Sequence, residues 1–266
     1  MIPAVLIAVV ITCCAGNDSA PQASITVEQR RAAINSAMEH LDADRINEAL
    51  AIISTLVKKD PASPQTQETY ATILLANSIN LDNIGELAKG LEYRQQALEA
   101  YKSACNYSSS PGLLQLSTAQ LAQMIGDNAT AKTFYMLAHA SNPTDGRPSF
   151  FLTQLYLLTK NWVQAKHWAN ESLLRDPNEP FTLLSASLAE AELGNVASAL
   201  HFAQRGCYIL PNDPKIRFMQ SRVIRLSGKP EHALEILSRL PEPLHSSEIA
   251  NDERQLCLQQ IQDGSE

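Results

Sequence analysis

The 266-residue sequence contains few aromatic residues and few glycines. Phe, Trp and Tyr make up 6% of the chain, and there are only ten glycines. Alanine and leucine are abundant instead, and this composition favours helices that pack closely through small side chains. The fourteen prolines are mostly spaced apart, as residues that interrupt helices would be. Hydrophobic residues account for 45% of the chain, enough for a substantial core.

The sequence also lacks an excess of positive charge. Its formal net charge is −7 and its isoelectric point is about 5.4. Binding to nucleic acid requires a basic footprint that neutralises phosphates. We therefore expect no nucleic-acid partner.

Motifs that carry catalysis or bind metals are missing as well. The six histidines form no HExxH pair, and the five cysteines form no CxxC or Cys/His cluster with metal-binding spacing. No GxSxG and no phosphate-loop motif is present. We therefore expect no catalytic residue, no metal and no cofactor, and we do not expect an enzyme. The isolated Cys105, Cys207 and Cys257 are interpreted as small apolar residues in helix packing.

An uncharged apolar run opens the chain and ends at Cys13 and Cys14. It is shorter than the roughly 20 residues of a membrane-spanning helix, but it has the length of a secretory signal. Followed by a polar stretch, it resembles a bacterial lipoprotein signal with Cys13 or Cys14 as the lipidated residue. We expect a signal over residues 1–14 and a flexible tether over 15–26. The protein would be secreted across the inner membrane, as a periplasmic or membrane-anchored lipoprotein; a plain signal-anchor and a cytoplasmic chain are the alternatives.

The middle of the chain repeats with a 34-residue period. Alanines recur at this spacing, a small residue stands twelve positions before each, and a turn residue stands five before. The alanines are Ala131, Ala165, Ala199 and Ala233. The small residues are Ala119, Thr153, Ser187 and Ser221. Two helices of about a dozen residues per period explain this pattern, because small residues at a helix crossing allow close approach.

Prolines twelve positions after the first three alanines, at Pro143, Pro177 and Pro211, end each second helix. Together these residues resemble the tetratricopeptide repeat family. Ala49 with Pro61 fits the same pattern, and Ala97 fits it more loosely. The interval from Ala49 to Ala97 is longer than one period, which predicts one enlarged repeat with extra turns around residues 80–91.

The resemblance implies an all-α fold, a right-handed α-solenoid of about six helix–turn–helix repeats over residues 27–245. Residues 246–266 are predicted to form a capping helix and a frayed tail, with Ser246 or Ser247 capping the helix start. A terminal helix with a polar outer face keeps such an array soluble.

The first helices of such repeats line a concave groove, and the resemblance places residues fifteen before the repeat alanines there. These residues are Leu116, Phe150, Leu184 and Phe218. They would form an apolar stripe that accepts an extended or helical peptide; the alternative is that they pack between neighbouring helices. Lys215, Arg222 and Arg225 could grip a carboxylate or an acidic segment, or they could form a solvated face.

These observations predict a non-catalytic scaffold or assembly factor whose partner is another protein or a peptide, tethered to a membrane through its anchor. The alternative is a regulatory or substrate-presenting subunit of an envelope enzyme complex. The sequence leaves the oligomeric state open.

Overall fold

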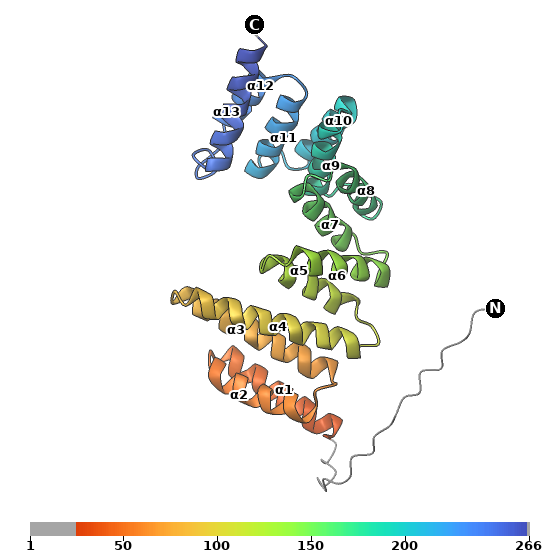
Figure 1. Ribbon diagram of the computed structural model, residues 1–266, viewed down its shortest axis with the longest axis vertical. Helices are drawn as coiled ribbons and strands as arrows, with labels where there is room; N and C mark the ends of the chain where they lie inside the picture. The colour runs from red at the N-terminus through yellow and green to blue at the C-terminus, as the bar shows by residue number, and fades with distance from the viewer. Residues whose placement is uncertain (1–24, 265–266) are drawn as a thin grey trace, which may run out of the picture.

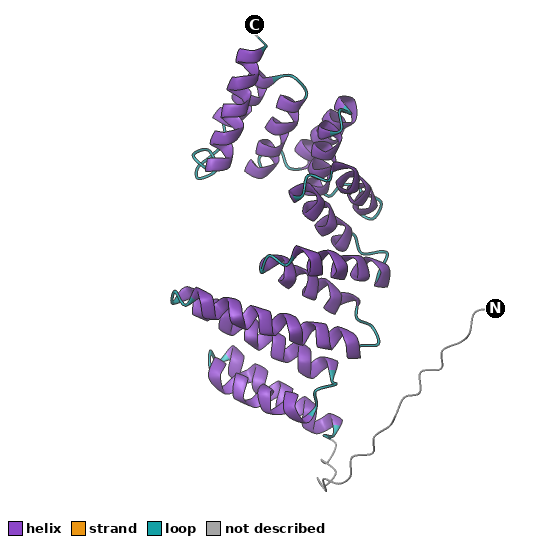
Figure 2. Ribbon diagram, viewed as in Figure 1, coloured by secondary structure: helices purple, strands orange, loops and turns teal. Residues whose placement is uncertain are grey.

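The computed structural model describes residues 25–264, and this range contains helices and no strand (Figures 1 and 2). Cys13 and Cys14 and the expected signal lie outside the described residues. The helices within the described range are α1 (Val27–Asp42), α2 (Ile46–Lys59), α3 (Pro64–Asn83), α4 (Leu87–Tyr107), α5 (Gly112–Met124), α6 (Asn128–Ser141), α7 (Arg147–Leu158), α8 (Trp162–Leu173), α9 (Pro180–Glu192), α10 (Val196–Ile209), α11 (Pro214–Leu226), α12 (Pro230–Ser238) and α13 (Glu248–Asp263).

Most first helices begin at a polar side chain that satisfies free backbone N–H groups. Thr26, Ser63, Glu179 and Asp213 accept hydrogen bonds from backbone amides at the starts of α1, α3, α9 and α11. Proline occupies the first turn of several of these helices, where its missing N–H has no helical partner to lose. The local sequence therefore sets the start of each repeat.

The turn between the two helices of a pair contains one residue in the left-handed conformation. Glycine fills this position at Gly126, Gly194 and Gly228, with φ between 80° and 86°. Lys160 occupies the equivalent place between α7 and α8 with φ of 54°. This conformation costs a residue with a Cβ roughly 1–2 kcal/mol, so glycine suits the turn best.

Close approach of the paired helices depends on the small residues of the repeat. The four repeat alanines and the four small residues twelve positions before them are all fully buried. In the α9–α10 pair, the Ser187 hydroxyl donates a hydrogen bond to the carbonyl oxygen of Ala199. A larger side chain at either position would push the two helices apart.

The helix pairs stack in chain order into an extended, curved array (Figure 1). Each helix packs against the next, and the first helices α7, α9, α11 and α13 also contact one another in sequence. The apolar core is correspondingly divided into clusters that follow the chain. The expectation of an all-α solenoid of six helix pairs with a further helix at the end is confirmed.

The second and longest pair, α3 and α4, is the enlarged repeat. α3 has 20 residues where α5 has 13, and Ala97 lies seven residues further into α4 than Ala131 lies into α6. The additional residues are thus shared equally, about two turns per helix. Because two turns restore the direction of a helix face, the pair still packs on both neighbours.

None of the helices formed by residues 25–264 combines the length and the apolar character required to cross a bilayer.

Candidate binding groove

The first helices from α5 to α13 begin along one edge of the array, and equivalent residues there form a row. This edge row occupies the first or second residue of each helix; its first four members stand eighteen positions before the repeat alanines, and the fifth follows at the same 34-residue interval. It consists of Leu113, Arg147, Phe181, Lys215 and Ile249. The three apolar members are exposed by 67%, 36% and 56%, so these side chains are available to a partner.

A mainly apolar hollow on this surface lies between α7, α9, α11 and α13. It has a volume of about 410 Å³, and three phenylalanines from successive first helices line it: Phe150, Phe181 and Phe218. Leu244, from the segment between α12 and α13, and Ile249 of α13 also line it. The last helix is therefore part of the groove as well as the end of the stack.

Polar contacts in this hollow are few. Gln154 Nε2 donates a hydrogen bond of 2.8 Å to Ser185 Oγ, which links α7 to α9 in the floor. Lys215 is the charged side chain among the lining residues, and it is exposed. The combination of an apolar floor with one cation at its edge suits an apolar side chain next to a negative charge.

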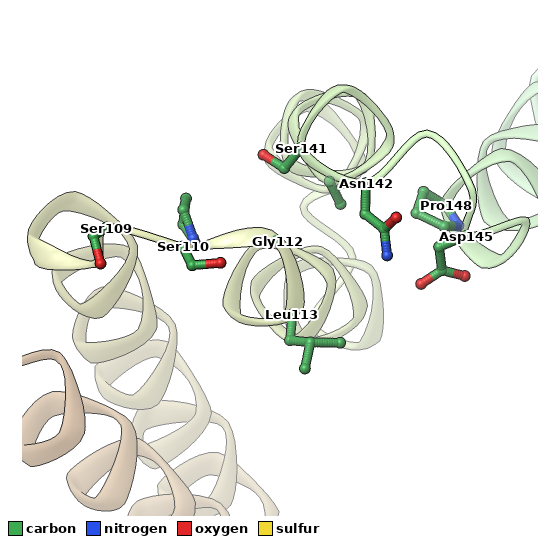
Figure 3. Close-up of a pocket in the computed structure, with 10 residues that line it drawn as sticks. Ser109, Ser110, Gly112, Leu113, Ser141, Asn142, Asp145 and Pro148 are labelled. Atoms are coloured by element: carbon green, nitrogen blue, oxygen red, sulfur yellow. The ribbon is translucent and has the colours of Figure 1, made fainter.

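Two further hollows continue the edge row toward the N-terminal half. One, of about 390 Å³, is lined by Arg147 and Phe150. The other, of about 420 Å³, lies between the α4–α5 and α6–α7 connections and includes Leu113. In Figure 3, Asn142 and Asp145 direct their polar ends toward the side on which Leu113 lies. Each member of the edge row thus lines one of three consecutive hollows.

Arg147 and Lys215 occupy equivalent positions but differ in their surroundings. The Arg147 guanidinium forms an ion pair with Asp145 at 2.7 Å, and this contact holds the pKa of Asp145 below its usual range. Lys215 Nζ makes no ion pair within the described part of the chain, and the nearby Asp213 carboxylate accepts hydrogen bonds from backbone amides at the start of α11. Lys215 therefore carries the uncompensated positive charge of the groove.

The structure divides the apolar stripe predicted from the sequence. Phe150 and Phe218 are half-buried and line the hollow, while Leu184 is 1% exposed and lies in its floor. Leu116 is 4% exposed and belongs to the core around α3–α8, so its assignment to an open groove was wrong. Whether Phe150, Leu184 and Phe218 contact a partner remains a prediction.

Arg222 and Arg225, which were predicted to grip a carboxylate or an acidic segment or else to form a solvated face, contact a carboxylate within the chain. Both side chains contact Glu253 of α13, whose carboxylate is almost fully buried. Arg225 Nε donates a hydrogen bond of 2.5 Å to Glu253 Oε1, and Arg222 Nε lies 3.6 Å from Oε2. The carboxylate that these arginines bind is internal, and it fixes the last helix to α11.

Phe181 and Ile249 were not predicted as groove residues, although the sequence contains a signal for them. They share the 34-residue spacing with Leu113, Arg147 and Lys215, but apolar and basic residues alternate along that row. A search for one residue type per position passes over such a pattern. Leu244 gives no signal of this kind, because it stands in the segment between two helices.

Metal-ligating side chains do not gather elsewhere: residues 25–264 hold no group of three or more His, Cys, Asp or Glu that could bind a metal ion. Burial raises the pKa of the Cys105 and Cys207 thiols and raises that of Cys257 to about 11. These thiols are therefore poor nucleophiles near neutral pH.

Comparison with known proteins shows the fold. No protein-family model matches the sequence, and no curated protein matches it. Solved structures do: a tetratricopeptide repeat protein from Parabacteroides merdae has a TM-score of 0.63 at 17% identity, covering 90% of this chain and 93% of its own. PilW, described as a type IV pilus biogenesis factor, has a TM-score of 0.60 at 14% identity, covering 85% and 99%.

YrrB, described as a tetratricopeptide repeat protein with an unusual peptide-binding site, has a TM-score of 0.54 at 14% identity, covering 79% of this chain and 97% of its own. At such low identity the similarity concerns the backbone arrangement. The chain thus has the fold of tetratricopeptide repeat proteins.

Proposed function

We propose that this protein is a non-catalytic scaffold that binds another protein or a peptide in the groove formed by α7, α9, α11 and α13. The observation that supports it is the apolar hollow lined by Phe150, Phe181 and Phe218, three partly exposed aromatic side chains from successive first helices. Exposed aromatic residues in a concave site are the usual anchors of a protein interface. The peptide-binding site named for YrrB and the role in pilus biogenesis named for PilW agree with this proposal.

Site-specific photo-crosslinking tests the groove directly. The residue p-benzoylphenylalanine is placed at Phe181, inside the groove, and separately at Tyr208, an 87% exposed tyrosine of α10. Crosslinking in intact cells followed by mass spectrometry identifies the neighbours of each position. We expect a defined partner from position 181 that position 208 does not capture. Equal capture from both positions, or none from 181, would contradict the proposal.

The second part of the proposal concerns location. The run that ends at Cys13 and Cys14 has the pattern of a lipoprotein signal, and one lipidated cysteine followed by residues 15–26 would tether the solenoid to a membrane surface. Labelling cells with an alkyne analogue of palmitate should mark the protein. The Cys13→Ser and Cys14→Ser variants identify the modified residue, and label retained in the double variant would disprove lipidation here.

The identity of the crosslinked partner separates two roles. An assembly factor should capture a structural component of the cell envelope. A regulatory or substrate-presenting subunit should capture an enzyme, whose activity then changes when Phe181 is replaced by alanine. We favour the first role, because PilW, which has a similar fold, is described as a pilus biogenesis factor.

A further inference from the structure

The residues of the edge row indicate which backbone conformation and which side chains a bound segment should have. Its members alternate in chemistry along the array: Leu113, Arg147, Phe181, Lys215, Ile249. One member belongs to each first helix, so neighbours in the row are separated by about the spacing of packed helices. A segment that lies along the row therefore meets apolar and basic positions in turn.

Helix spacing limits which backbone conformations match this row. α7, α9, α11 and α13 contact one another in sequence, and packed helices lie roughly 8–10 Å apart. A polyproline II segment has three residues per turn and rises about 3.1 Å per residue, so its same-face side chains recur every ~9 Å. An α-helix returns to the same face after two turns, about 10.5 Å. The packing range of roughly 8–10 Å includes the polyproline II repeat and falls short of the two-turn repeat of an α-helix, which favours polyproline II.

The charges along the row indicate the sign of the charge that a bound segment should carry. Arg147 is already paired with Asp145, and Arg222 and Arg225 share the carboxylate of Glu253. Lys215 alone among these cations is without an ion pair, and it lies between the apolar Phe181 and Ile249 on the rim of one hollow. A carboxylate on the partner would complement Lys215, and bulky apolar side chains on either side of it would enter the hollow.

We infer that the occupant of the groove is an extended polyproline II segment of a partner protein, with an acidic residue flanked at three residues on each side by bulky apolar residues. This inference rests on the proposed function, since it specifies the ligand of the same groove. Phe181 and Ile249 receive the two apolar side chains, and Lys215 pairs with the carboxylate.

A synthetic peptide of this pattern tests the inference on the full chain. The fluorescein-labelled probe holds one glutamate with a leucine three residues before and after it, in a proline- and serine-rich background, and fluorescence anisotropy reports its binding. Replacing the glutamate of the peptide by glutamine should weaken binding about two- to fivefold, as for an exposed ion pair. Phe181→Ala and Ile249→Ala should weaken binding further.

Charge reversal gives the decisive comparison. The Lys215→Glu variant should prefer a peptide that carries lysine in place of glutamate, whereas Lys58→Glu, a matched change on exposed α2, should keep the original preference. Equal responses of both variants would overturn the inference, as would tighter binding of a helical peptide with the same residues seven apart. A crosslinked partner from position 181 combined with no peptide preference would leave the proposed function standing and remove this inference alone.

Discussion

The repeat alanines are the residues on which the spacing of this solenoid depends. Ala199 is fully buried where α9 and α10 cross, and its carbonyl oxygen accepts the hydrogen bond from Ser187. Leucine at this position would force the helices apart, so Ala199→Leu should lower the free energy of unfolding by roughly 1–3 kcal/mol. Urea denaturation followed by circular dichroism measures the loss. Ala197→Leu, on the exposed side of α10, should change stability little, and equal losses would contradict the crossing role.

Substitutions at two residues that line the same hollow should have different effects, one mainly on binding and the other mainly on stability. Phe150 is half-buried at the surface of the hollow, so Phe150→Ala should reduce peptide or partner binding with a small change in melting temperature. Leu184 is 1% exposed and packs in the α9–α11 core, so Leu184→Ala should lower the free energy of unfolding by about 2–5 kcal/mol. Thermal melting and peptide anisotropy together check both. A large loss of stability in Phe150→Ala would place that residue in the core instead.

The same residues show how far sequence alone could define the groove. The regular repeat period placed Phe150, Leu184 and Phe218 on equivalent turns, and all three line the hollow. Periodicity gives the direction of a side chain but not its depth, which is why Leu116 was misplaced. Side-chain contacts between helices cannot be predicted from the repeat either. Nothing in the repeat pattern indicates that Arg225 pairs with Glu253 of another helix.

At the scale of helices, α13 both ends the stack and completes the groove. Glu253 of α13 is buried against Arg222 and Arg225 of α11, and Ile249 of the same helix lines the hollow. Glu253→Gln removes the charge that both arginines require, and we expect a loss of about 2 kcal/mol in the free energy of unfolding. Amide hydrogen exchange should accelerate in α13 first. Glu248→Gln, exposed in the first turn of α13, serves as the control and should leave exchange unchanged.

Helix boundaries were accessible from the sequence because they depend on local signals. Prolines, capping residues and turn glycines mark the ends of most pairs, and even the enlargement of α3 and α4 followed from the long interval between Ala49 and Ala97. The contribution of α13 to the groove was not accessible. The direction of a terminal helix depends on one buried ion pair and on the segment before it, and neither repeats along the chain.

For the whole molecule, a core that is divided along the chain implies that a destabilising substitution affects mainly its own repeat and the neighbouring repeats. The clusters of α1–α3 and of α9–α13 share no buried residue, and each helix pair contacts its immediate neighbours. In such a quasi-one-dimensional array, stability is a sum of repeat and neighbour contributions. Ala165→Leu in α8 should therefore accelerate amide exchange in α7–α10, with a much smaller effect on α1 and α2.

Hydrogen exchange with mass spectrometry, resolved helix by helix, measures that profile. Wild-type protein in dilute urea provides the reference, because denaturant weakens every repeat at once. A uniform rise in exchange across all helices of the Ala165→Leu variant would mean that the solenoid unfolds as a single cooperative unit. A confined rise would mean that the α1–α4 end can hold its structure while the groove around α7–α13 opens, and that the groove can rearrange around a partner without loss of the rest of the fold.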